Sequence, residues 1–300
     1  MNAIDRLIEL DCMTAKRIAV IGDSLTDIYI HGRLESCQDD CQKFVEESRV
    51  ECDGGARNAA RSLENWNAET IMFFDLRGDS IVKTRFVANG KCALRHDNDT
   101  ISFDLSLARR ETMKSLDSWK PNAVLISDYD KGFLTPEFIR QIIEYSQRRG
   151  IPCVADAKRE PELYREAIIK FNDDYERRFF LQCERLTNMV KTNGDSHPVV
   201  QFSERREVSR QIATVVTRKP LWSVSKLPKV KCVSHVGAGD CFAAHLTLAL
   251  AHGMSLEDSA AIAHSAGRVY VQHPHNRPPY PHEIRADFLN LGEPILPCKK

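Results

Sequence analysis

Short apolar segments alternate along the chain with longer segments whose apolar residues recur at helical spacing. The short segments predict strands at 17–23, 70–76, 123–127 and 151–155. The intervening segments predict a helix at 56–66 and another from Thr135, with Pro136 at its first helical position and Gly150 at its end. Strands that alternate with helices in this way predict a mainly parallel sheet with helices on both faces.

Two early regions, 28–52 and 81–103, do not fit this alternation and are typical of β-hairpins. In the second region Asn89-Gly90 separates two extended runs, which predicts a type I′ turn. Hairpins inserted early in an α/β chain would form a small sheet beside the main one. We therefore predict an α/β fold with a β-sheet lid formed by about 28–52 and 81–103.

Length and composition narrow the class of protein. The 300 residues suffice for one large α/β domain, and no linker-like stretch divides them, so we expect a single domain over 1–300. Lys plus Arg and Asp plus Glu each total 42, a balance that argues against a nucleic-acid partner. No long apolar run or signal peptide is evident, and the ten scattered cysteines favour reduced thiols. We expect a cytoplasmic protein with no membrane partner.

The strongest local signal is the run Val236-Gly237-Ala238-Gly239-Asp240 before an Ala/Leu-rich segment that predicts a helix. Small residues at a helix start let the backbone approach a ligand, and the free amides and helix dipole there attract anions. Asp240 beside such an anion hole has the chemistry to accept a proton from an attacking hydroxyl. The alternative is a Gly-rich turn whose Asp merely favours the helix dipole. No GxxxxGK[ST] is present, which excludes a P-loop kinase.

The run VSHVGAGDCFAAHLTLAL resembles the C-terminal signature of the ribokinase-like, PfkB-type carbohydrate kinases, and CDGGARNAA at 52–60 resembles their GGxxxN motif. The likeness extends from about residue 17 to 283. Within the family, IGDSLTD, VKTRFVANGKCALRHD, ISDYDKG and ADAK are most similar to the D-glycero-β-D-manno-heptose 7-phosphate kinases. The resemblance implies a ribokinase-like fold, ATP and Mg²⁺ as cofactors, a sugar phosphate as substrate, and a homodimer formed through the lid.

The resemblance also assigns roles to residues. It makes Asp240 the catalytic base, with Gly237, Ala238 and Gly239 as the anion hole. The sugar hydroxyls would be held by the acid that ends the first strand, a second acid after it, and the GGxxxN motif; these are Asp23, Asp27, Gly54, Gly55 and Asn58. Carboxylates and amides suit this task because they hydrogen-bond readily with adjacent hydroxyls. For the two glycines, the alternative is a tight turn before the helix.

A phosphorylated sugar would require cations on the protein. Five basic residues lie on the second hairpin or after predicted strands, namely Lys83, Arg85, Arg95, Lys131 and Lys158. Positions 83 and 85 are two apart, so both side chains would project from the same face of a strand. The carboxyl ends of parallel strands are the usual ligand side of such folds. For any single one of these charges, the alternative is a solvated side chain.

The nucleotide side departs from the family pattern. The family's Asn-x-x-Glu would fall at Asn172, but position 175 is Tyr, and Glu176 is one residue late as a metal-organising carboxylate. The nucleotide motif Thr-x-Gly-x-x-Gly would begin at Thr192 and Gly194, but its second Gly is His197. The Asn expected on the adenine side is His264. These changes affect metal and nucleotide handling, whereas the predicted base and anion hole are intact.

Three further hypotheses remain beside the heptose phosphate kinase. In the first, the chain would be a kinase for another acceptor, such as a fructose phosphate, ribose or a nucleoside. In the second, the chain would be a degenerate family member that binds a sugar phosphate or a protein without catalysis. The departures from the family pattern on the nucleotide side favour this hypothesis. The last alternative is a dinucleotide oxidoreductase, but no GxGxxG follows the first strand.

Overall fold

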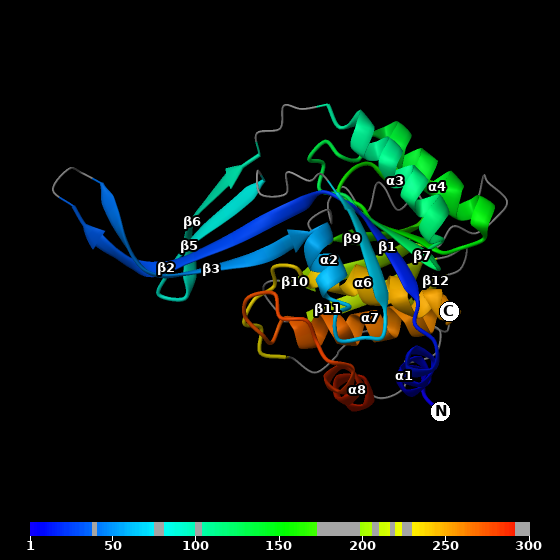
Figure 1. Ribbon diagram of the computed structural model, residues 1–300. Coiled ribbons are helices and arrows are strands. Elements are labelled where there is room, and N and C mark those ends of the chain that lie inside the picture. The colour runs from blue at the N-terminus through cyan, green and yellow to red at the C-terminus, as the bar shows by residue number, and fades with distance from the viewer. Residues whose placement is uncertain are drawn as a thin grey trace.

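The computed structural model describes residues 1–37, 41–74, 81–99, 104–172, 199–205, 210–216, 220–223 and 230–291. They form a large sheet covered by helices and a separate smaller sheet that extends away from it (Figure 1). This is the α/β architecture with a lid that the sequence predicts.

The large sheet has eight strands among the described residues. In spatial order they are β12 (Pro220–Ser223), β11 (Arg210–Val216), β10 (Val199–Arg205), β9 (Ile168–Asn172), β8 (Cys153–Asp156), β7 (Ala123–Ser127), β1 (Arg17–Gly22) and β4 (Glu69–Phe74). From β4 to β10 the neighbouring strands pair in parallel, and β11 and β12 then pair antiparallel at one edge. The carboxyl ends of the parallel strands therefore meet along one side of the sheet, where ligands bind in folds of this kind.

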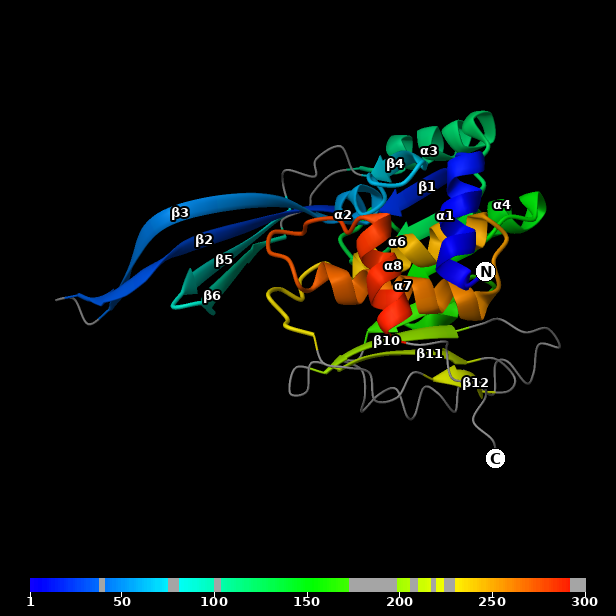
Figure 2. The same ribbon diagram turned by 90° about the horizontal axis from the view of Figure 1, so that it is seen from below.

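Helices bury both faces of this sheet. One core lies under α1 (Ala3–Met13), α2 (Ala56–Arg61), α6 (Ala238–Ala251), α7 (Leu256–Tyr270) and α8 (Pro281–Asn290). The other core lies under α3 (Ser106–Trp119), α4 (Pro136–Arg149) and the short 3-10 helix η1 (Pro161–Tyr164). In β1, Ile18 and Val20 face the first core whereas Ala19 and Ile21 face the second, because successive side chains of a strand point to opposite faces. Figure 1 shows the two helical layers on either side of the strands, and Figure 2 views the molecule from the side of α1, α7 and α8.

Local sequence signals set the ends of several helices. The Thr135 hydroxyl accepts a hydrogen bond from the Phe138 amide (3.2 Å), Pro136 is the first residue of α4, and Gly150 ends it with a φ of 62°. Ser255 caps α7 in the same way. Among the described helices, none combines the length and hydrophobicity needed to cross a bilayer.

The lid is a four-stranded sheet in the order β3-β2-β5-β6. Its strands are β2 (Ser24–Ser36), β3 (Gln42–Gly55), β5 (Val82–Ala88) and β6 (Lys91–Asn98). Asn89 and Gly90 connect β5 and β6, and both have positive φ (52° and 71°), as the predicted type I′ turn requires. β5 pairs with β2 only from Thr26 to Gly32, so the outer halves of β2 and β3 continue as a two-stranded ribbon.

The predicted elements differ from the structure mainly at their ends. The helix predicted at 56–66 ends at Arg61, because the amides of Leu63, Glu64 and Trp66 bond to carbonyls three residues earlier and tighten the chain into turns. The strand predicted at 151–155 is β8, which begins at Cys153. The antiparallel edge strands β11 and β12 lie in a stretch to which the sequence analysis assigned no element.

Candidate active site

The start of α6 forms one wall of the candidate site. Gly237 has a φ of 84°, in the left-handed region that favours glycine. The Ala238 amide donates to the carbonyl of His235 (3.2 Å), so it is engaged within the turn. The amides of Gly239 and Asp240 make no hydrogen bond to any residue that the structure describes. Two main-chain donors at the positive end of the helix dipole are therefore open to an anion.

The Asp240 carboxylate faces inward beside these amides and is 2% exposed. One oxygen accepts from the Tyr129 hydroxyl (2.7 Å) and the other from the Asn58 amide (2.8 Å). Burial, followed by the charge of Asp156, raises the pKa of Asp240 to about 6, against the opposing effects of Lys158 and the two hydrogen bonds. A carboxylate of this basicity is ionised at neutral pH and is a better proton acceptor than an ordinary aspartate.

Asn58 links the two glycine motifs of the sequence. It lies in α2, and its amide also reaches the carbonyl of Gly237 (3.3 Å), while its own carbonyl oxygen accepts from the Tyr270 hydroxyl (3.0 Å). A side chain at Gly237 would place its Cβ 2.4 Å from both Asn58 Nδ2 and Tyr270 Oη. Glycine at 237 is therefore required both by its φ and by this close approach. The sequence assigned Asn58 to the sugar hydroxyls; here its amide group holds Asp240.

Gly54 and Gly55, at the end of β3, also permit close approaches. A Cβ on Gly54 would lie 2.7 Å from a carboxylate oxygen of Asp27. Gly55 has a φ of 59°, and its Cβ would meet the carbonyl oxygen of Asp23 at 2.3 Å. Gly54 and Gly55 thus form a tight turn before α2, which was the alternative to a sugar-binding role. The turn also lets the Asp27 carboxylate lie close to the backbone of Gly54.

Asp23, which follows β1, organises the loop at 128–134. Its carboxylate is 1% exposed and accepts three main-chain hydrogen bonds, from the amides of Tyr129 (2.9 Å), Lys131 (3.1 Å) and Phe133 (3.2 Å). Burial raises the pKa of Asp23 even though these amides favour its ionised form. The three bonds fix the loop that carries the ISDYDKG motif.

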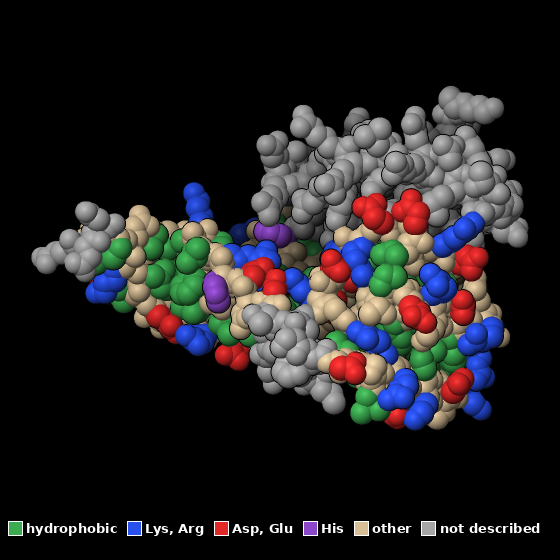
Figure 3. All heavy atoms as spheres, turned by 90° about the horizontal axis from the view of Figure 1, so that it is seen from above, with side chains coloured by type: hydrophobic (Ala, Val, Ile, Leu, Met, Phe, Trp, Pro, Cys, Tyr) green, Lys and Arg blue, Asp and Glu red, His purple; other side chains and the backbone are tan. Residues whose placement is uncertain are grey.

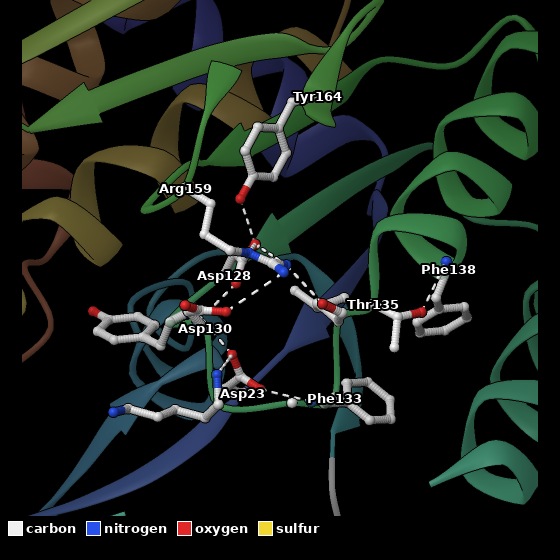
Figure 4. Close-up of polar contacts among 12 residues, drawn as sticks. Asp23, Asp128, Asp130, Phe133, Thr135, Phe138, Arg159 and Tyr164 are labelled. Atoms are coloured by element: carbon white, nitrogen blue, oxygen red, sulfur yellow. Dashed lines mark hydrogen bonds and ion pairs between the residues drawn. The ribbon is translucent and has the colours of Figure 1, made fainter. Parts of the chain in front are cut away.

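Charged side chains hold the same loop from its other side (Figure 4). Asp128 is fully buried and accepts hydrogen bonds from the Arg159 guanidinium and the Tyr164 hydroxyl. Arg159 also donates to the carbonyl of Leu134 (2.6 Å), and Arg109 in α3 donates to the carbonyl of Phe133 (2.8 Å). The loop is thus tied to β1, to η1 and to α3, which gives Tyr129 a defined position beside Asp240.

Two lysines flank the Tyr129 ring. Lys83 Nζ from the lid lies 4.8 Å from the ring centroid, and Lys158 Nζ, after β8, lies 4.9 Å from it. Lys83 is 8% exposed, and burial lowers its pKa. Next to it on the lid, Arg85 forms an ion pair with Asp27, and both side chains are largely buried. Basic groups from the lid and from the sheet therefore converge near the predicted base.

Strand register determines which basic residues share a face of the lid. Asp27 is paired with Lys83 between β2 and β5, and Arg85 is paired with Arg95 between β5 and β6, so all four project from one face. Arg95 is exposed and bridges to Asp97, its neighbour on β6. Figure 3 shows basic and acidic side chains gathered where the lid joins the rest of the molecule. Lys131, from the loop at 128–134, forms an ion pair with Asp99 at the end of the lid.

A buried ion cluster lies at the carboxyl ends of β8 and β9. Asp156 is 1% exposed and pairs with Lys158 (3.2 Å) and with Lys170 (2.8 Å), which is fully buried. Burial opposes the ionisation of Asp156, but the two ammonium groups hold its pKa below the usual range. Burial also lowers the pKa of Lys170 to about 8. The cluster places one carboxylate and two ammonium groups near Asp240, and the Asp156 carboxylate opposes the ionisation of Asp240 whereas Lys158 favours it.

The residues predicted for the nucleotide and metal lie mostly outside the described chain. Glu176, Thr192 and Gly194 fall in residues 173–198, which the structure does not describe, and Asn172 is the last residue of β9. His264 is buried in α7 at 1% exposure. Within the described ranges, no group of three or more His, Cys, Asp or Glu side chains is arranged to hold a metal ion. Mg²⁺ in phosphoryl-transfer enzymes is often held mainly by substrate phosphates, water and one or two carboxylates.

Three contributors to the site were not identified from the sequence: Tyr129, Asp156 and Lys170. Tyr129 lies inside the ISDYDKG motif and Asp156 inside ADAK. Both motifs were recognised in the sequence, but no role was assigned to these two residues. Lys170 is a lysine in an otherwise apolar strand segment, which was the available signal.

Comparisons with known proteins agree with this architecture. Residues 210–283 match the family model described as pfkB family carbohydrate kinase. Bifunctional protein HldE of Hyphomonas neptunium is 25% identical over 87% of this chain and 61% of its own length, and HldE of Helicobacter pylori strain HPAG1 is 26% identical over 95% and 69%. The chain spans about three fifths of the length of the first of these curated relatives.

Two solved structures share the fold. Phosphofructokinase-2 from Escherichia coli, in complex with potassium, superposes with a TM-score of 0.71 at 15% identity, covering 94% of this chain and all of the other. Ribokinase from Arabidopsis thaliana, complexed with ribose and ATP, superposes with a TM-score of 0.62 at 14% identity, covering 92% and 99%. The chain is thus similar to the pfkB family carbohydrate kinases in sequence over residues 210–283, and its fold is that of the ribokinase-like kinases.

Proposed function

We propose that this protein transfers the γ-phosphoryl group of ATP to a hydroxyl of a phosphorylated sugar, with Asp240 as the general base. The observation that carries the proposal is the inward-facing Asp240 carboxylate, with a pKa raised to about 6, beside two amides at the start of α6 that bond to none of the residues the structure describes. A base and an anion hole within one small volume are what in-line phosphoryl transfer to a hydroxyl needs from the protein.

In this proposal the acceptor hydroxyl approaches Asp240 and gives up its proton to the carboxylate as the oxygen attacks phosphorus. The amides of Gly239 and Asp240 stabilise the charge that develops on the transferring group. Lys158, beside Asp156, adds a cation on the same side. Mg²⁺ bound with the nucleotide would supply the remaining neutralisation of the phosphate charge. Closure of the lid would exclude water, which otherwise competes as acceptor.

The acceptor that we propose is an anionic sugar, a heptose 7-phosphate phosphorylated at its anomeric hydroxyl. The basic side chains Lys83, Arg85 and Arg95 on one face of the lid support a phosphate on the substrate. The ISDYDKG stretch and the hairpin at 82–97 resemble the heptose 7-phosphate kinases, and the matched relatives are HldE proteins. Kinases for a neutral sugar or a nucleoside would have no use for these cations.

The first experiment is a substrate screen with Mg-ATP and a panel of sugar phosphates and free sugars. We expect ATP consumption with a heptose 7-phosphate, and a loss of about 10²- to 10⁴-fold in kcat for Asp240→Asn, because that change removes the base. Asp258→Asn, in the first turn of α7, is the matched control and should keep wild-type activity. A wild-type protein that consumes no ATP with any acceptor contradicts the proposal. Sugar-phosphate binding in calorimetry without nucleotide binding would then favour a non-catalytic member.

A second experiment tests the phosphate on the acceptor. Arg85→Ala should raise KM for a phosphorylated sugar at least tenfold and change KM little for its unphosphorylated analogue, because only the former carries a phosphate that the guanidinium could bind beside its partner Asp27. Arg33→Ala is the control, since Arg33 lies on the same sheet but is half-exposed and pairs with Glu35 and Glu47. Equal increases for both sugars would contradict an anionic acceptor.

We also propose that the protein forms a homodimer through the lid and resides in the cytoplasm. The face of the lid opposite the basic residues carries Phe44 and Phe86 in edge contact and the exposed Leu94 and Leu34 (60% and 41%). Figure 3 shows hydrophobic side chains along the outer part of the lid. Apolar patches of this kind are usually covered by a partner. Leu94→Glu should halve the mass measured by light scattering; a wild-type monomer at micromolar concentration would contradict the dimer.

A further inference from the structure

Tyr129 lies at the centre of the candidate site, although it belongs neither to the glycine motifs nor to the basic residues predicted to bind the substrate phosphate. Its hydroxyl donates to Asp240 Oδ1 at 2.7 Å, its amide donates to Asp23 at 2.9 Å, and the ammonium groups of Lys83 and Lys158 lie 4.8 and 4.9 Å from the centroid of its ring. One residue therefore contacts the predicted base, the end of β1, a lysine of the lid and a lysine after β8.

The hydroxyl of Tyr129 acts as a donor in this arrangement. Burial, followed by the neighbouring carboxylate of Asp240, raises the pKa of Tyr129 well above its ordinary value, so the phenol keeps its proton at neutral pH. A donated hydrogen bond stabilises the ionised form of the acceptor carboxylate more than its protonated form. The Asn58 amide does the same at the other carboxylate oxygen. The two donors fix the plane of the carboxylate and leave one lone pair on each oxygen for a further partner.

We propose that Tyr129 is a positioning residue that orients the Asp240 carboxylate and keeps it ionised in a buried, low-dielectric site, an inference that rests on the proposed function. The lid contacts this group of residues through Lys83, whose ammonium lies against the Tyr129 ring. A movement of the lid would therefore shift Tyr129 and change the orientation of the Asp240 carboxylate.

Other groups also act on the charge of Asp240. Asp156 disfavours its ionisation and Lys158 favours it, and the Lys170 ammonium is near enough for its own pKa to respond to Asp240. From α7, the Tyr270 hydroxyl donates to Asn58 and is near enough to Asp240 for the carboxylate to raise the pKa of Tyr270. Replacement of Tyr129 by Phe changes none of these charges, and the ring that lies against the two lysines is retained. The variant therefore isolates the hydroxyl.

The first readout does not require activity. In protein labelled with ¹³C at the aspartate carboxyl carbon, the Asp240 resonance is assigned by its loss in Asp240→Asn. Its titration midpoint should move upward by about one pH unit or more in Tyr129→Phe, because one charge-assisted hydrogen bond is lost. The matched control is Tyr145→Phe, which removes a buried tyrosine hydroxyl that donates to the carbonyl of Leu116 (2.8 Å), away from the site. That variant should leave the Asp240 midpoint unchanged.

The second readout is kinetic. With the acceptor found in the substrate screen, Tyr129→Phe should lower kcat at pH 6 about fivefold or more, with little change in KM, and should recover most of this loss at pH 8 to 9, where Asp240 is ionised without help. A residue that merely supports the fold or binds the sugar would lower activity by the same factor at every pH.

The outcomes separate the two proposals. An Asp240 midpoint that is the same in wild type and Tyr129→Phe overturns the role of Tyr129, whether or not the protein is a kinase. A shifted midpoint in a protein that phosphorylates no acceptor supports the role of Tyr129 and contradicts the proposed function. If Tyr129→Phe does not fold, wild-type protein labelled at the tyrosine ζ-carbon replaces it. The Tyr129 resonance should then titrate with the Asp240 midpoint and lose this step in Asp240→Asn; a flat resonance overturns the proposal.

Discussion

Replacement of Arg159 by Met is the most direct test of how the loop at 128–134 is held. Arg159 donates two hydrogen bonds to the fully buried Asp128 and one to the carbonyl of Leu134, and it lies 3.5 Å from Asp130. Its own side chain is 18% exposed. Methionine keeps much of the volume but removes every one of these bonds (Figure 4).

The expected loss in the free energy of unfolding follows from the buried Asp128 carboxylate, which the substitution leaves without its ion-pair partner. Asp128 would keep the Tyr164 hydroxyl and the Asp130 amide as donors but would lose its ion pair with the Arg159 guanidinium. Breaking a buried ion pair by removing one partner costs about 3–5 kcal/mol, and uptake of a proton by the stranded carboxyl limits the loss. Because Arg159 is partly exposed, we expect Arg159→Met to lower the free energy of unfolding by about 3 kcal/mol.

Urea-induced unfolding followed by tryptophan fluorescence measures this loss. The matched control is Arg149→Met, which breaks the exposed pair with Asp117 (2.9 Å) and should cost less than about 1 kcal/mol. The double variant Arg159→Met with Asp128→Asn should be more stable than Arg159→Met alone, because no buried charge is then stranded. The reasoning is refuted if Arg159→Met costs no more than Arg149→Met.

Three further predictions concern the site and the core. Gly237→Ala should lower kcat by about 100-fold or more, since its Cβ would lie 2.4 Å from Asn58 and Tyr270 and displace the group that holds the base; steady-state kinetics measures this. For the wild type, log kcat should fall with unit slope below about pH 6, because the raised pKa of Asp240 means that protonation removes the base there. His245 is fully buried, and burial lowers its pKa to about 4, so the unfolded chain binds its proton at higher pH than the folded one. Stability should therefore fall by roughly 3 kcal/mol as the pH drops from 6.5 to 4, and His245→Gln should lose less over that range in urea unfolding.

Local patterns predicted the elements and some of their ends correctly. Thr135 with Pro136, and Asn89 with Gly90, specify a helix start and a type I′ turn through bonds and dihedral angles within a few residues. The burial of β7 on both faces follows from its continuous apolar run at Ala123–Ser127. The order of the strands in the large sheet, and the antiparallel edge, depend on pairings between distant segments that no local pattern encodes.

In the candidate site, too, local patterns indicated some residues, whereas the contacts between distant residues appear only in the structure. Asp240, which we propose as the base, and the glycines around it were singled out from the sequence, because a Gly-rich turn before a helix has chemical consequences by itself. The structure adds partners within the protein for two residues predicted to contact the sugar: Asp23 accepts from three loop amides, and the Asn58 amide donates to Asp240. The sequence motif contained both residues without indicating their partners.

The sequence alone determined the class of fold, the lid hairpins and the chemistry available at the start of α6, because each depends on spacing and residue type within a short segment. Only the tertiary structure decided that Tyr129, Asn58 and Asp240 meet, since they come from three elements separated by 71 and 111 residues or more along the chain. Their hydrogen bonds, and the burial that raises the pKa of Asp240, exist only once the sheet and helices have packed.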